Sequence, residues 1–276
     1  MLDEKNTAVI TYVDNNYELN LKNDFLYTLR NVANYKGKVV VLDYGISTEV
    51  CRIIKNEYGV DVISFEKEYP VFSIRNKHIP FVINELPNNI SNVMVIDGGD
   101  IWFQSSIKDI FEITCGSIGY VEESIKFGNN EWTEKCLDVL EEKEKKRVLK
   151  KVEGRFVKNS GMVCGPRNWI AELLNNVYID MCNSGREFFG VDQIYFNYEL
   201  CEKFSSKSIS ISDVYNYVLV THPNEYTQIG SKFYKKSGDL ITIVHNAGGK
   251  WRVISKDYNK ENLDGEQYSL DRVNYL

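Results

Sequence analysis

The sequence predicts an α/β fold in which a mostly parallel central sheet is flanked by helices. Short β-branched and apolar runs alternate with amphipathic segments, a pattern typical of βαβ units. Residues 93–96 (VMVI) carry no polar side chain, as expected of a strand that is buried on both faces of a sheet. The chain has no internal repeat, low-complexity linker or clean domain break, so we expect one domain over residues 1–276.

The beginning of the chain predicts a parallel strand pair. Ala8–Val13 is a short β-rich run that ends in turn-forming residues, and Leu19–Val32 carries apolar residues at helical spacing. Lys38–Leu42 is a second, fully apolar run. A strand, a helix and a strand at this separation form a βαβ unit, so we expect the two strands to be parallel.

Further helices and strands are predicted from helix-capping residues, proline and charge patterns. Pro80 is expected to open a helix that ends at Leu86, because proline is tolerated in a first helical turn. Residues 131–152 are strongly charged and predict one solvated helix with i,i+4 Glu–Lys pairs. Further helices are expected at residues 47–58, 107–111, 169–181 and 190–200. Further strands are expected at residues 60–65, 117–121, 209–211, 217–220 and 240–244, with a small antiparallel addition near the C-terminal edge.

Charge and cysteine usage narrow the class of protein. The chain has 33 Lys and Arg against 39 Asp and Glu, with no unbroken basic block, which argues against a nucleic-acid partner. Its six cysteines are widely spaced without a CxxC pair, and we expect buried thiols in a reducing cytosol. No signal-like start or eighteen-residue apolar run is present, and acids offset the lysines of residues 256–276. We therefore expect a cytoplasmic protein with no strong membrane signal.

Asp97 and Asp100 follow the apolar strand and are separated by two glycines. Ligands of open α/β sheets bind at the carboxyl ends of the strands. Glycines let the backbone approach a bulky group, and carboxylate oxygens suit Mg²⁺ or Mn²⁺. The motif therefore predicts a divalent metal, Mn²⁺ or Mg²⁺, that holds a diphosphate. An Asp-Gly turn in a solvent loop is the alternative.

Polar clusters also end two other strands, at residues 14–17 (DNNY) and 245–250 (HNAGGK). A histidine can complete a metal shell, and a lysine after two glycines can contact a diphosphate. Each residue also has an ordinary alternative. These alternatives are a structural hydrogen bond for His245, a core position for Tyr17, a plain turn for residues 159–161 and a helix cap for Asp192.

Several motifs follow one another along the chain. They are VDNNYELNLKNDFLYTLRN, VVVLDYGISTEVCRII, VMVIDGGDIWFQSSIKDIFE, NSGMVCGPRNW, GVDQIYFN and HNAGGKW. In this order they resemble glycosyltransferase family 8, nucleotide-sugar enzymes that include bacterial galactosyltransferases and glycogenins. The resemblance implies a GT-A fold with a nucleotide-binding half at residues 8–125, an acceptor and sugar half at residues 126–255, and a polar tail at residues 256–276.

The resemblance implies roles for the nucleotide-binding residues. Asp14, Asn16 and Tyr17 would contact the uridine, with Tyr17 stacking on the base. Gly248 and Lys250 would meet the diphosphate, where a cation stabilises the departing negative charge.

The resemblance also implies metal ligands. Asp97 matches the first metal-binding aspartate of the family, and His245 matches the distant ligand. The second acid, Asp100, is displaced by one residue from the family's Asp-x-Asp pattern. Either Asp100 reaches the metal through a bulged turn, or only Asp97 and His245 bind it.

The remaining matches concern the transferred sugar. Asn159 and Ser160 would line the sugar pocket, and Arg75 would reach the sugar or a phosphate. Asp192 and Gln193 match the polar pair beside the anomeric carbon and are the expected catalytic residues.

The function expected from the resemblance is transfer of a hexose from a UDP-sugar to a hydroxyl acceptor of a saccharide, lipid-linked or protein molecule. The family implies retention of anomeric configuration and dependence on Mn²⁺ or Mg²⁺. The shifted aspartate and a terminal motif one residue short favour a non-catalytic nucleotide-sugar-binding module as an alternative. A nucleotidyltransferase is a third possibility, but the chain lacks a glycine-rich basic loop after its first strand.

Overall fold

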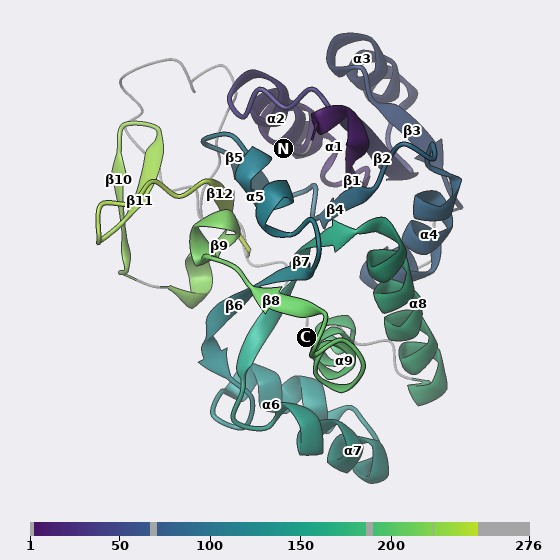
Figure 1. Ribbon diagram of the computed structural model, residues 1–276, viewed down its shortest axis with the longest axis vertical. Coiled ribbons are helices and arrows are strands. Elements are labelled where there is room, and N and C mark those ends of the chain that lie inside the picture. The colour runs from purple at the N-terminus through teal and green to yellow at the C-terminus, as the bar shows by residue number, and fades with distance from the viewer. Residues whose placement is uncertain (1–2, 67–70, 186–189, 223, 248–276) are drawn as a thin grey trace.

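The computed structural model describes residues 3–66, 71–185, 190–222 and 224–247, without the side chains of residues 71–73. A seven-stranded sheet in the order β3-β2-β1-β4-β7-β6-β8 forms its centre (Figure 1). The strands β1 to β4 pair in parallel, β7 is antiparallel to β4 and β6, and β8 is parallel to β6. The strands are β1 (Thr7–Asp14), β2 (Lys38–Tyr44), β3 (Asp61–Ser64), β4 (Asn92–Ile96), β6 (Ile118–Lys126), β7 (Phe156–Pro166) and β8 (Ser208–Ser210). The predicted α/β class and mostly parallel sheet are confirmed.

Both faces of the central sheet are covered by apolar cores. In β4, Val93 and Val95 belong to one core, and Met94 and Ile96 belong to the other. Successive side chains of a strand point to opposite faces, so a run without polar residues supplies both cores at once. This arrangement explains why the sequence of β4 shows no alternation.

Two groups of helices cover opposite faces of the sheet (Figure 1). One core includes the helical segment formed by α1 (Glu18–Asn20), a π-helical turn (Leu21–Leu26) and α2 (Tyr27–Asn31), together with α3 (Thr48–Tyr58) and α5 (Lys108–Ile113). The other core includes α4 (Val71–Glu85), α6 (Glu131–Asp138), α7 (Glu142–Val152), α8 (Arg167–Ser184) and α9 (Val191–Glu202). Among the described residues, no helix is both long and apolar enough to cross a bilayer.

Two small sheets lie beside the central one. In the first, β12 (Ile243–His245) is antiparallel to β5 (Ile101–Phe103) and parallel to β9 (Tyr217–Val218). The second is the antiparallel pair β10 (Tyr226–Ile229) and β11 (Lys232–Lys235). Short 3-10 turns occur at Glu4–Asn6, Asp213–Tyr215 and Leu219–Thr221. The predicted antiparallel addition is confirmed. The chain enters the three-stranded sheet through a turn at residues 97–100, between β4 and β5.

Two helix predictions were wrong in their limits. The helix expected to open at Pro80 is α4, which is already helical at Val71 and contains Pro80 in its interior. Proline removes one backbone donor, but α4 packs along α8, and this tertiary contact outweighs the local preference.

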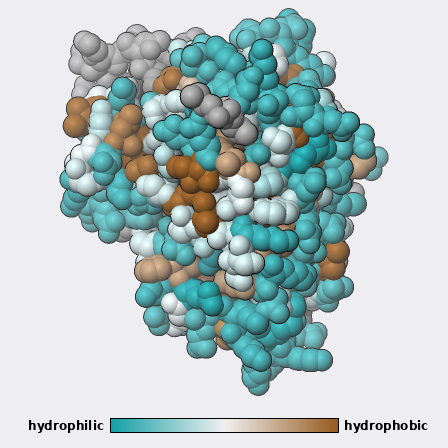
Figure 2. Space-filling model, viewed as in Figure 1, coloured by the Kyte–Doolittle hydropathy of each residue, from teal (hydrophilic) through white to brown (hydrophobic). Residues whose placement is uncertain are grey.

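The charged segment forms two helices instead of one. The Asn130 side chain caps α6, and the chain breaks before α7 at Glu141. Of the expected i,i+4 pairs, Glu142–Lys146 forms at 3.1 Å, whereas Lys145 binds Asp138 in place of Glu141. The surface over α6 and α7 is hydrophilic, as expected of solvated helices (Figure 2).

The cysteine prediction was correct only in part. All six cysteines are free thiols. Cys136 and Cys164 are buried, but Cys115 and Cys182 are exposed, because each lies at the end of a helical segment where apolar neighbours in sequence do not guarantee burial.

Candidate functional site

Asp97, Asp100 and His245 come together where β4 leaves the central sheet. Asp97 directly follows β4, Asp100 directly precedes β5, and His245 ends β12, the strand that pairs with β5. One ligand atom from each residue lies within 4.8 Å of the other two. Nε2 of His245 is 3.6 Å from Oδ1 of Asp100 and 3.9 Å from Oδ2 of Asp97. The pairing of β5 with β12 therefore brings Asp100 beside His245 despite its shifted position.

These three groups fit a hard divalent cation. Two carboxylate oxygens and an imidazole nitrogen are suitable ligands for Mn²⁺ or Mg²⁺. In an octahedral shell with bonds of about 2.1 Å, ligand atoms are about 3 Å apart when adjacent and about 4.2 Å apart when opposite. The observed 3.6 and 3.9 Å lie between these two values, so small side-chain movements would bring the three atoms into such a shell. The other oxygen of Asp97, Oδ1, accepts hydrogen bonds from Tyr12 and Arg75, which leaves Oδ2 turned toward His245.

Gly161 in β7 keeps space for this cluster. A Cβ atom at Gly161 would lie 2.7 Å from Cε1 of His245 and 2.8 Å from Oδ2 of Asp97. The backbone N–H of Asp97 donates to the carbonyl of Gly161 at 2.9 Å. Residues 159–161 are thus part of a strand and approach the cluster closely, so the plain-turn alternative was wrong.

A chain of amides orients the imidazole of His245. Nδ1 of His245 lies 3.2 Å from Oδ1 of Asn216, and Nδ2 of Asn216 donates to Oδ1 of Asn159 at 2.9 Å. With Asn216 accepting, Nδ1 carries a proton, so in the neutral imidazole Nε2 is the nitrogen available to a metal. A hydrogen bond of this kind fixes the tautomer and ring orientation of metal-binding histidines.

Arg75 links the cluster to the predicted catalytic pair. Its guanidinium, almost fully buried, donates to Oδ1 of Asp97 at 2.6 Å and to Oδ2 of Asp192 at 2.5 Å. Asp192 lies in the first turn of α9 but does not cap it, since Gly190 occupies the N-cap position. The helix-cap alternative was therefore wrong. Gln193 accepts hydrogen bonds from the backbone and the hydroxyl of Ser160, both at 3.1 Å.

The sequence analysis missed Glu123, which joins two of the predicted residues. Oε1 of this buried carboxyl accepts from Asn159 at 2.8 Å and from Gln193 at 3.2 Å. Glu122 and Glu123 are adjacent in β6, and nothing in the sequence marks which of them points inward. Tyr12 and Asn216 were missed for the same reason, since their roles depend on contacts across strands.

Burial and neighbouring charge act on the titrating groups. Burial raises the pKa of Asp97 to about 6, although Arg75 and His245 oppose the shift. Part of the Asp97 side chain is still exposed to solvent, so neighbouring groups surround the carboxyl group without enclosing it. Burial lowers the pKa of His245, but Asp100 and Asp97 outweigh this and leave that pKa above its ordinary value. The site therefore concentrates negative potential at the imidazole, as a cation site requires.

The loop after β1 lies against the glycine turn. Asp14 is nearly buried, and its carboxylate accepts from the backbone and side-chain N–H groups of Asn16 at 2.9 and 3.1 Å. Tyr17 is 45% exposed, so the alternative of a core position was wrong. A Cβ atom on Gly99 would lie 2.7 Å from the Tyr17 ring. The structure thus brings the loop of Asp14, Asn16 and Tyr17 next to the Asp97–Asp100 turn.

The predicted diphosphate residues Gly248 and Lys250 lie outside the described residues. Of the other predicted site residues, one group surrounds the candidate metal position, and a second group forms the loop beside Gly99. The first group is Arg75, Asp97, Asp100, Asn159, Ser160, Asp192, Gln193 and His245. No known protein-family model matches the chain, and a search among characterised proteins found no significant match.

Proposed function

We propose that this chain is a metal-dependent glycosyltransferase that moves a hexose from a UDP-sugar to a hydroxyl acceptor. The observation that carries the proposal is the convergence of Asp97, Asp100 and His245 within 4.8 Å at the carboxyl end of a parallel strand. In open α/β sheets this position is where nucleotides and their phosphates bind. The family resemblance of the ordered motifs supplies the donor class, UDP-sugar, and the expectation of retention.

The proposed division of roles follows the geometry. Asp97, Asp100 and His245 would hold Mn²⁺ or Mg²⁺, which when bound offsets the negative charge of the departing diphosphate. The exposed Tyr17 ring offers a stacking surface for the uracil base. Asp14 and Asn16 form a rigid polar turn beside it that can bind the edge of the nucleoside.

The buried polar groups would position the sugar. Arg75 fixes the carboxyl group of Asp192 by a short hydrogen bond, which suits Asp192 to bind sugar hydroxyls. Gln193 is fixed by Ser160 and Glu123, and a fixed amide can orient a reacting group without further loss of side-chain freedom.

A non-catalytic nucleotide-sugar-binding module is the second candidate. One observation favours it: Arg75 already neutralises both Asp97 and Asp192. A guanidinium in this position partly substitutes for a cation and would weaken metal binding. The two candidates differ in turnover and agree in nucleotide binding.

Calorimetry with Mn²⁺, with UDP and with both together tests the proposed site. We expect UDP binding to tighten when Mn²⁺ is present, and Asp97→Asn to remove that effect. Asp61→Asn is a matched control, because it removes the same charge from an exposed ion pair with Lys38. Absence of UDP binding in the presence of Mn²⁺ would refute the proposal in both forms.

Release of UDP from UDP-glucose and UDP-galactose then separates the two candidates. Slow hydrolysis that Asp192→Asn abolishes supports the transferase. Tight UDP binding without any release of UDP from a panel of donors supports the binding module.

A further inference from the structure

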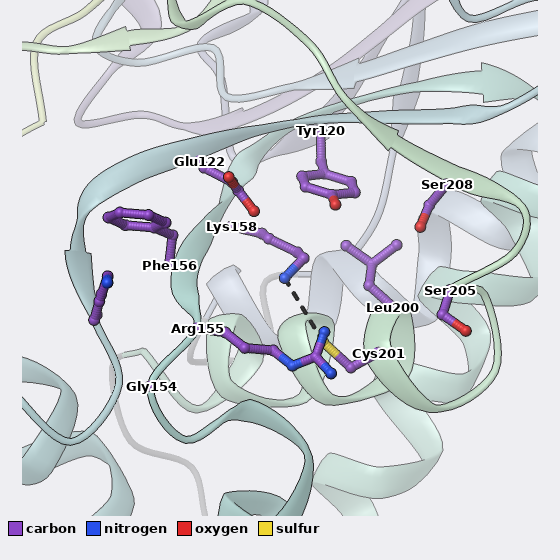
Figure 3. Close-up of a pocket in the computed structure, with 11 residues that line it drawn as sticks. Tyr120, Glu122, Gly154, Arg155, Phe156, Lys158, Leu200, Cys201, Ser205 and Ser208 are labelled. Carbon is purple, nitrogen blue, oxygen red and sulfur yellow. Dashed lines mark hydrogen bonds between the residues drawn. The ribbon is translucent and has the colours of Figure 1, made fainter.

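A recess lies away from the candidate metal site. It has a volume of about 290 Å³ and is bounded by β6, β7 and the C-terminal end of α9 (Figure 3). Glu122 of β6 and Lys158 of β7 pair in register at its wall. The next residues, Glu123 and Asn159, bind each other on the side of the candidate site. The two strands therefore present different side chains to two separate polar regions.

The wall of this recess is cationic in an acidic protein. Lys126, Arg155 and Lys158 contribute three cations, against the single acid Glu122. The whole chain carries a formal net charge of −6. None of the ion pairs between described residues includes any of these three cations. The recess thus carries more positive than negative charge, and its three cations form no ion pair with a described residue.

Lys158 is the most informative of these cations, because it is only 5% exposed. Its Nζ lies 3.7 Å from Sγ of Cys201 and 5.2 Å from the centre of the Tyr120 ring. Figure 3 shows the side chain extending across the recess toward Cys201. A thiol and a ring face are weak partners for an ammonium, and the recess that Lys158 lines leaves room for a stronger one. An oxyanion that entered the recess would supply that partner.

The other walls favour an organic anion over a bare ion. Tyr120, Phe156 and Leu200 add apolar surface, and Nζ of Lys126 lies 4.5 Å from the centre of the Phe156 ring. Phe156 is 41% exposed, so its ring lies at the rim with Lys126 and the exposed Arg155. Ligand sites typically combine apolar walls with a few converging polar groups, in volumes from about 300 Å³ upward.

We propose that this recess binds the phosphate monoester or carboxylate group of a small organic molecule, with Lys158 as the buried anion contact and Arg155 as the contact at the rim. The site is separate from the Asp97 cluster. It does not depend on the proposed transferase activity.

Binding of three probes to the full chain tests the proposal. Phenyl phosphate, benzoate and inorganic phosphate are titrated by calorimetry at low ionic strength and without divalent cations, so that the candidate metal site plays no part. We expect phenyl phosphate or benzoate to bind more tightly than inorganic phosphate, because the ring gains contact with Tyr120 and Phe156. Whichever of the two binds more tightly identifies the anionic group.

Substitutions of individual cations test whether the probes bind in this recess. Lys158→Met is expected to weaken it about tenfold or more, the usual cost of losing a hydrogen bond to a charged group. Arg155→Met is expected to weaken it as well, and it alters an exposed side chain. Lys146→Met is the matched control: it removes the same charge from an exposed position on α7 and should leave the affinity unchanged.

Two results would overturn the proposal. One is the absence of binding of all three probes to the unaltered chain. The other is unchanged affinity in the variants. If Lys158→Met fails to fold, the affinity of Arg155→Met for the probes is the deciding measurement. Unchanged affinity of that variant would show that the anion binds elsewhere.

Discussion

Nε2 of His245 lies 3.9 Å from Oδ2 of Asp97, although the two residues end strands of different sheets. Asp97 follows β4 of the central sheet, and His245 ends β12 of the three-stranded sheet. Their proximity depends on the turn at residues 97–100 and on the absence of a side chain at Gly161. The candidate metal centre is therefore a junction between two sheets, and its geometry is sensitive to changes at that junction.

Replacement of Gly161 by alanine should disturb this junction. The added methyl would lie under 3 Å from His245, Asp97 and Asn159, so strand β7 must shift or the cluster must open. We expect a loss of about 1–3 kcal/mol in the free energy of unfolding, as for other overpacked sites. Urea denaturation measures it, and Mn²⁺ titration should show weaker binding.

Gly116→Ala is the control for this change. A Cβ atom at Gly116 meets nothing within 4 Å, so its unfolding midpoint should match that of the unaltered protein. Equal midpoints for Gly161→Ala and Gly116→Ala would show that the junction tolerates a methyl group.

Arg75 should contribute strongly to stability. Arg75→Met leaves the carboxylates of Asp97 and Asp192 without their shared cation in a largely buried setting. Breaking a buried ion pair from one side typically costs about 3–5 kcal/mol. Lys38→Met breaks an exposed pair with Asp61 and should cost less than about 1 kcal/mol. Similar unfolding free energies for both variants would contradict a central role for Arg75.

Glu123 is predicted to stabilise the fold through one oxygen of its carboxyl group. Oε1 accepts both hydrogen bonds, from Asn159 and Gln193, so Glu123→Ala leaves two buried amides without that acceptor. We expect Glu123→Ala to lose about 1–3 kcal/mol of unfolding free energy. Glu123→Gln keeps an acceptor oxygen and should lose less. Denaturation of both variants at pH 7 distinguishes this role from a requirement for negative charge, which would make the two equally unstable.

Glu199 in α9 should make stability depend on pH. Burial raises its pKa above the ordinary 4.5, although Lys203 lies 3.0 Å from Oε2 and opposes the shift. The folded state therefore holds the proton more tightly than the unfolded state, and stability falls as pH rises from about 4.5 through the raised value. Glu199→Gln has no carboxyl group to ionise, so this fall in stability is absent. The stability of the variant relative to the unaltered protein should therefore increase as pH rises through this range.

Glu142→Gln is the control for Glu199, because Glu142 is an exposed acid on the neighbouring helix α7. Comparison of the two variants between pH 4 and 8 separates the effect of burial at Glu199 from that of removing one exposed carboxyl group. Thermal unfolding across this range provides the measurement. If the difference in unfolding temperature between Glu199→Gln and the unaltered protein did not change with pH, a raised pKa of Glu199 would be contradicted.

Much of the fold followed from local patterns. The strands β1, β2 and β4 of the parallel half could be predicted because each is a largely apolar run with turn residues after it. The limits of α4 could not, since its packing on α8 overrides the local signal of Pro80. The split between α6 and α7 depends on which residues of a charged segment reach the core, and charge alone does not specify that.

By itself, the sequence determined the α/β class, the parallel pairing of the first two strands and the polar residues at the strand ends. These properties are local: an apolar run forms a buried strand, and glycine and aspartate mark its end. The tertiary structure alone decided that Asp100 lies beside His245, that Arg75 joins Asp97 to Asp192, and that Glu123 instead of Glu122 points toward Asn159. Those contacts depend on strand register and on the placement of one sheet against another, which arise only when distant segments pack together.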